Sequence, residues 1–97
     1  MIIVTGSIVA TPGNEAEVEQ LALEHVRRSR TEPGCLLHSV HRDVENPSRF
    51  VFVEHWADRA ALDQHFAVPA SLDMVTRAAE LASERPTIEI YEAERAR

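Results

Sequence analysis

The pattern of hydrophobic and polar positions predicts four β-strands along this chain of 97 residues. Residues 2–10, IIVTGSIVA, are apolar and mostly β-branched, which is typical of a strand buried on both faces. Residues 35–43 and 49–57 form two further apolar stretches around VENPS, which predicts a hairpin with a loop of about five residues. Residues 87–94, TIEIYEAE, alternate between apolar and polar side chains and predict the last strand.

Two helical regions separate these strands. Asn14, followed by Glu17 three residues later, predicts a capping box at the start of the first helix. The second region is divided, because Asp58 can cap a short helix and Pro69 can open a longer one that Pro86 ends. The apolar stripe of the first helix consists of Val18, Leu21, Ala22 and His25, with Val26 and Ser29 at its edge. The stripe of the longer later helix is expected to consist of Leu72, Val75, Ala78 or Ala79, and Ala82.

The order β-α-β-β-α-β is typical of an α+β, ferredoxin-like fold, in which helices cover one face of a four-stranded antiparallel sheet. We expect one domain over residues 1–97. The third strand is apolar on both faces, with Val51 and Val53 on one side and Phe52 and Trp56 on the other. A lone chain would leave one of these faces in water, so the sequence predicts a homodimer that packs sheet on sheet.

The hairpin register assigns the polar residues of the two middle strands to faces. A turn centred near residues 45–47 pairs Val40 with Phe52, His38 with Glu54, and Leu36 with Trp56. His38, Glu54 and Trp56 then share the bulkier face, which we expect under the helices, whereas His41 and His55 point the other way. A cavity is expected there, with Gly6 leaving room for it and with walls formed by Trp56, Phe52, Leu62, Phe66, His25 and His65.

Composition excludes several classes of partner. The net charge of −6 argues against nucleic acid, whose phosphates select clusters of basic residues. No apolar run is long enough to span a membrane and no signal-peptide pattern begins the chain, so a cytoplasmic protein without a membrane partner is expected. Cys35 is the one cysteine, which excludes an internal disulfide.

The candidate chemical groups each have a structural interpretation beside a functional one. Trp56 is either a large core residue or a stacking surface for a planar ligand. Glu54 is either a satisfied strand carboxylate or an acid or base tuned by His38. His65 is either a structural histidine or a base facing the cavity. No metal site is predicted, because His38 and His41 have opposite parity on a strand and the histidine spacings match no metal motif.

The central segment, EPGCLLHSVHRDVENPSRFVFVEHWADRAALDQHF, resembles the signature of antibiotic biosynthesis monooxygenase domains. The matching elements are the Pro-Gly-Cys turn at residues 33–35, the Asp-to-Pro turn at 43–47, the Glu-x-Trp strand end at 54–56, and His65. The junction TPGNEAEVEQL fits the same family, so the resemblance covers nearly the whole chain.

The resemblance implies a dimeric α+β barrel with a site between sheet and helices in each protomer. Better-known members of the family oxidise quinols or polycyclic phenols with O₂, without flavin, haem or metal, and a tryptophan matching Trp56 lies in the wall of their site. The chemistry needs a base that forms the phenolate, for which His65, His38 and Glu54 are available. Phe52 stands where some members have a pocket asparagine. Gly6 stands where the haem-degrading branch has one, so haem degradation is not expected.

The leading hypothesis is therefore a cofactor-free monooxygenase that acts with O₂ on a small quinol or phenolic aromatic. The catalytic candidates are His65, His38 and Glu54, and the substrate-binding candidates are Trp56, Phe52, Phe66, Leu62, Gly6 and His25. Two alternatives remain open at this point: an isomerase or other proton-transfer enzyme on a small oxygenated metabolite, and a non-catalytic ligand-binding dimer.

Overall fold

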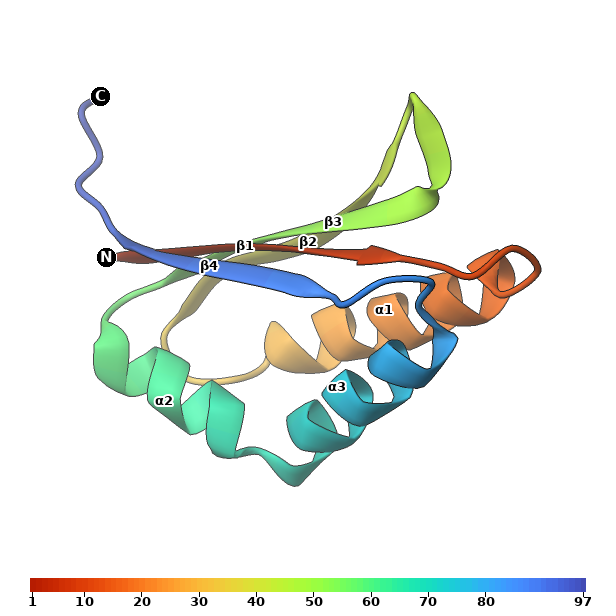
Figure 1. The fold of residues 1–97 in the computed structure, drawn as a ribbon. Coiled ribbons are helices and arrows are strands. Elements are labelled where there is room, and N and C mark those ends of the chain that lie inside the picture. Colours follow the sequence, from red (N-terminus) through yellow and green to blue (C-terminus); the bar gives the residue numbers. More distant parts are fainter.

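Three helices cover one face of a four-stranded antiparallel sheet in the computed structural model, which describes residues 1–97 (Figure 1). The sheet order is β2-β3-β1-β4, so the first strand pairs with the third and the last. This arrangement confirms the predicted ferredoxin-like α+β fold. The elements in chain order are β1 (Ile2–Val9), α1 (Glu15–Ser29), β2 (Cys35–Asp43), β3 (Asn46–Trp56), α2 (Arg59–Ala67), α3 (Pro69–Leu81) and β4 (Thr87–Glu92).

The register between β2 and β3 confirms two of the three predicted pairs. His38 lies opposite Glu54 and Val40 lies opposite Phe52. The predicted pairing of Leu36 with Trp56 is wrong, because an irregularity between Cys35 and Leu37 places Cys35 opposite Trp56. The extra residue belongs to a bulge, which shifts the register locally and leaves the rest of the ladder in place.

The hairpin is tighter than the predicted five-residue loop. The third strand begins at Asn46, so only Val44 and Glu45 lie between the strands. Side chains hold this end together: Asp43 Oδ1 accepts a hydrogen bond of 2.8 Å from the Glu45 N–H, and Asn46 Oδ1 accepts one from the Ser48 N–H. Such Asx-type bonds replace part of the backbone pairing, which explains why the strands continue into the segment predicted as loop.

The stripe predicted for α1 is buried in the structure, but its capping box is wrong. Buried residues of α1 are Val18, Ala22, His25, Val26 and Ser29, and Leu21 is half-buried. The Asn14 side chain caps no backbone N–H and instead donates to the carbonyl of Leu81, which joins the start of α1 to the end of α3. At α2 the prediction is confirmed, because Asp58 accepts a hydrogen bond of 2.9 Å from the Ala61 N–H. Pro69 is the first residue of α3, also as predicted.

The buried face of α3 differs from the predicted stripe. Leu72 and Val75 are 58% and 63% exposed, whereas the buried residues are Ser71, Met74, Ala78 and Leu81. The helix packs against α1 and α2, which rotates its contact face away from the stripe that a helix lying flat on the sheet would bury. None of the three helices has both the length and the apolar character that crossing a membrane requires.

Apolar side chains form two buried groups under the helices. The larger group joins the sheet to α1 and α3 and includes Phe50 and Phe52. The smaller group surrounds Trp56 and Leu62 at the α2 end. Strand β1 contributes Ile2, Val4 and Ile8 to this side, but its outward residues are only half-buried. The predicted burial of β1 on both faces is therefore absent from a single chain, because nothing in it covers the outer face of the sheet.

Gly34 lets the turn between α1 and β2 pack closely against α2. Its φ of +80° lies in the left-handed region, and a Cβ added there would come within 2.5 Å of the Ala61 Cβ. Its carbonyl also accepts a hydrogen bond of 2.8 Å from the Ala57 N–H. The turn and the first residues of α2 are thus packed without spare room.

We predict that Gly34→Ala lowers the free energy of unfolding by more than Gly13→Ala does. Both glycines have positive φ, which costs about 1–3 kcal/mol for another residue. Only Gly34 adds a steric contact, since a Cβ at Gly13 meets nothing within 4 Å. Urea unfolding of both variants measures the difference, and equal losses would contradict the packing described for this turn.

Candidate active site

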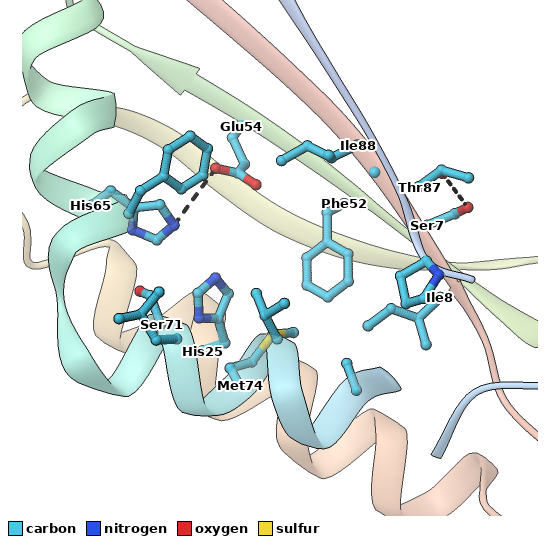
Figure 2. Close-up of a pocket in the computed structure, with 16 residues that line it drawn as sticks. Ser7, Ile8, His25, Phe52, Glu54, His65, Ser71, Met74, Thr87 and Ile88 are labelled. Carbon is cyan, nitrogen blue, oxygen red and sulfur yellow. Dashed lines mark hydrogen bonds and ion pairs between the residues drawn. The ribbon is translucent and has the colours of Figure 1, made fainter. Parts of the chain in front are cut away.

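A cavity of about 310 Å³ lies between the sheet and the helices, with walls from both layers (Figure 2). Most of its lining is apolar, and one end carries the polar groups His25, Glu54 and His65. Its apolar walls include Ile8, Phe52, Phe66, Leu72, Met74 and Ile88. An apolar cavity with a few convergent polar groups is the usual form of a small-molecule site.

Six of the nine candidate site residues line this cavity, and three lie behind it. The six are His65, Glu54, Phe52, Phe66, Gly6 and His25. Trp56, His38 and Leu62 do not line it and are almost fully buried. The Trp56 ring packs under the His65 ring with centroids 4.6 Å apart, so His65 separates the indole from the cavity. The structure therefore places Trp56 beneath the polar end and gives the aromatic wall to Phe52 and Phe66.

Gly6 lines the cavity for a reason that the sequence did not indicate. A Cβ at this position would lie 2.8 Å from the carbonyl oxygen of Thr87 on β4. The absence of a side chain lets β1 and β4 approach, as glycine in a strand often does. Gly6 thus brings the β4 wall, including Ile88, up to the cavity.

Glu54 is the buried carboxylate at the polar end. Its Oε1 accepts a hydrogen bond of 2.9 Å from the Trp56 indole N–H, and lies 3.3 Å from His38 Nε2 and 3.9 Å from His65 Nε2. Burial alone raises the pKa of the carboxyl, but His38 and the Trp56 N–H outweigh it and hold the pKa of Glu54 below its usual range. The carboxylate is therefore ionised beneath the helices.

Glu32 is a site residue that the sequence analysis missed. It belongs to the turn between α1 and β2, and its Oε1 lies 2.8 Å from Nδ1 of His65. A carboxylate only accepts, so Nδ1 carries the hydrogen and the neutral ring keeps its lone pair on Nε2. The two residues are 33 positions apart, so no spacing rule connects them. The one available signal was a glutamate directly before the Pro-Gly turn that the family signature contains.

His25 enters the same end of the cavity from α1. Its Nδ1 accepts a hydrogen bond of 2.6 Å from the Arg28 guanidinium, so in the neutral ring Nε2 carries the hydrogen. Burial lowers the pKa of His25 to about 3, helped by the neighbouring His38 and His65. His25 is therefore neutral at physiological pH.

The fold and the cavity define an α+β domain of ferredoxin-like topology with a ligand-sized site under its helices. The family model for antibiotic biosynthesis monooxygenases matches residues 1–77. The chain belongs to the antibiotic biosynthesis monooxygenase family, as the resemblance in its central segment implied.

Solved structures agree with this assignment. A Deinococcus radiodurans protein, provisionally described as an antibiotic biosynthesis monooxygenase, is 31% identical with a TM-score of 0.94, covering 99% of this chain and 95% of its own. A second structure described as an antibiotic biosynthesis monooxygenase is 32% identical with a TM-score of 0.89, covering 98% and 100%. A conserved protein from Methanosarcina mazei is 25% identical with a TM-score of 0.90, covering 96% and 92%.

Among curated proteins, an uncharacterized protein of Synechocystis sp. is 36% identical over 90 residues, which is 93% of this chain. The chain spans 61% of the length of that relative. Together with the family model, these similarities support membership of the antibiotic biosynthesis monooxygenase family.

We predict that the His25 ring stays neutral through the pH range in which an unperturbed histidine, with a pKa of about 6.5, becomes charged. Since the folded pKa is lower than the unfolded one, the stability linked to this ring is lost as pH falls from about 6.5 toward 3. Titration of the ring Cε1–H signals by NMR, with His25 assigned by its loss in His25→Gln, measures this. A His25 signal that moves with a midpoint near 6.5 would contradict the burial and contacts described for the ring.

Proposed function

We propose that this protein is a cytoplasmic homodimeric monooxygenase that oxidises a quinol or phenolic aromatic with O₂ and without a bound cofactor. The observation that carries the proposal is the arrangement of His65. Its Nδ1 is held by Glu32 at 2.8 Å, and its ring lies at the polar end of a mostly apolar cavity (Figure 2). A neutral imidazole held in one tautomer suits the removal of a hydroxyl proton.

The polar end suits a hydroxyl donor for a second reason. His65 Nε2 and Glu54 Oε1 are 3.9 Å apart and both are acceptors when the ring is neutral. A phenolic O–H placed beside them supplies the hydrogen that neither group has. His65 then takes the proton, and Glu54 stabilises the imidazolium that forms. The apolar walls, with Phe52 and Phe66, face the ring and exclude water from the phenolate.

The reaction needs no electron source beyond the substrate. A quinol with a free ring C–H position and O₂ together give a hydroxyquinone and one water. One oxygen atom enters the ring and the other leaves as water, and the quinol supplies all four electrons. Deprotonation by His65 makes the ring electron-rich enough to react with O₂, and the proton returns to the water that forms. Trp56 acts from beneath by holding Glu54 through its indole N–H.

We predict that His65→Gln lowers the turnover of a responsive quinol by about 10²–10⁴-fold, as the loss of a general base does. The measurement is O₂ consumption with a panel of one-ring and two-ring quinols, corrected for spontaneous oxidation. His41→Gln is the matched control, because His41 is exposed on the outer face of the sheet. The proposal fails if no quinol consumes O₂ faster with the wild-type protein than with His65→Gln. Turnover that is unchanged under nitrogen would instead favour a proton-transfer enzyme.

The homodimer in this proposal is supported by the outer face of the sheet. Val51, Val53 and Ile3 on this face are only half-buried in one chain. Leu37 and Tyr91 extend it and are 40% and 47% exposed. An apolar sheet face of this kind suits packing against the same face of a second copy about a two-fold axis.

We predict that Val53→Lys converts the dimer into a monomer, because a lysine at the centre of this face would bury its charge in the interface. Light scattering after size-exclusion chromatography measures the mass, with wild type at twice the mass of one chain. Val44→Lys is the matched control, since Val44 is 99% exposed at the tip of the β2–β3 hairpin. A Val53→Lys protein that stays dimeric would place the interface elsewhere.

A further inference from the structure

Three buried histidines from three different elements meet behind and beside the polar end of the cavity. His25 comes from α1, His38 from β2 and His65 from α2, and each is at most 6% exposed. One ring nitrogen from each lies within 4.8 Å of the corresponding atoms of the other two. The ring centroids are 5.2 Å apart for His25 and His38, 5.1 Å for His25 and His65, and 5.5 Å for His38 and His65.

His38 has no hydrogen-bond partner for either ring nitrogen. Both atoms are fully buried and neither makes a hydrogen bond, although Nε2 lies 3.3 Å from Glu54 Oε1. Buried polar groups are nearly always paired, and an unpaired one in a native structure calls for a missing partner. In the proposed reaction His38 acts only through Glu54 and transfers no proton, so the reaction leaves both of its ring nitrogens without a partner.

We propose that His25, His38 and His65 bind a divalent transition-metal ion such as Zn²⁺, with Glu54 as the fourth ligand. Imidazole nitrogens and a carboxylate oxygen are ligands that Zn²⁺ takes in a tetrahedral site, with bonds of about 2.0–2.2 Å. Such bonds put the ligand nitrogens roughly 3.3 Å apart, so the rings need to close by no more than about 1.5 Å. Figure 2 shows Glu54, His65 and His25 at one end of the cavity.

The surroundings already supply part of an outer shell. Metal-binding histidines usually donate their other ring N–H to a carboxylate, which orients the ring. Glu32 does this for His65, because it occupies Nδ1 and leaves Nε2 toward the cluster. The Trp56 N–H does the same for the carboxylate ligand by holding Glu54 Oε1 at 2.9 Å. The negative charge of Glu54 offsets the charge of the ion.

Arg28 is the neighbouring group that disfavours metal binding. Its guanidinium donates to His25 Nδ1, which places the ring hydrogen on Nε2, the nitrogen left to face the ion. Binding requires that this hydrogen move to Nδ1 and that Arg28 turn away from it. Arg28→Gln removes the positive charge and provides an amide oxygen that accepts from the Nδ1–H. Arg28 therefore weakens the site in the wild-type chain, and Arg28→Gln should strengthen it.

An ion at this site would take the lone pair of His65. If the protein has the proposed function, on which this consequence rests, the ion inhibits quinol oxidation. Removing the ion with a chelator then restores activity. The binding itself does not depend on that function, so it is tested in the absence of any substrate.

The test uses Co²⁺ as a spectroscopic probe on untagged, chelator-stripped protein. We expect one Co²⁺ per chain with the visible absorption bands of a tetrahedral site. His38→Gln should weaken binding by at least about 100-fold, whereas His41→Gln and His55→Gln, on the outer face, should leave it unchanged. Arg28→Gln should tighten binding by about 10-fold.

Circular dichroism of each variant shows whether it is folded. The gain expected for Arg28→Gln does not depend on a destabilised variant and so tests the site even if His38→Gln fails to fold. Unchanged Co²⁺ affinity in a folded His38→Gln protein would overturn the proposal, as would the absence of saturable binding in both wild type and Arg28→Gln. Either result leaves the quinol measurements unaffected, so the two proposals can fail separately.

Discussion

The burial of one ionised carboxylate is the constraint on which the rest of the structure depends. Glu54 lies under the helices, where an unpaired charge is strongly destabilising, so its neighbours must satisfy it. The Trp56 N–H does so from two residues further along β3, and His38 approaches from the facing strand. The His38 contact requires the β2–β3 register to be correct at this point, and the bulge at Leu36 lies just beyond it. His65 then closes the arrangement from α2.

The alternation of side chains in β3 gives the sheet two different faces. Phe52, Glu54 and Trp56 point into the protein, where they form the floor of the polar end. Val51 and Val53 point outward, where nothing in a single chain covers them. A single strand thus contributes both to the cavity and to the surface that we propose for dimerisation.

Much of the fold was predictable because its determinants are local. Strand alternation, the Asp58 cap and Pro69 at the start of α3 are set by residues near each other in the chain, and the pairing of His38 with Glu54 follows from the hairpin. Two of the failures have causes that the pattern of side chains does not contain. The face of α3 is decided by its packing on α1 and α2, and the pairing of Leu36 by a bulge that periodicity does not show.

The same distinction applies to the candidate site. Six of its predicted residues line the cavity because strand and helix faces are periodic. The contact of Glu32 with His65 joins a turn to a helix that packs on it, and no sequence pattern encodes that approach. Trp56 was expected in the wall, but the His65 ring packs over it and separates it from the cavity. This contact depends on how α2 packs on the sheet, which the sequence pattern does not show. The meeting of three histidines from α1, β2 and α2 is equally invisible in their spacing.

The exposure of Leu72 and Val75 has a consequence for how this protein could evolve. Both line the cavity from α3, yet neither belongs to the buried face by which the helix is anchored. Their size can therefore change without disturbing the buried face of α3. The volume of the cavity can therefore vary at α3 while the polar groups His25, Glu54 and His65 stay the same.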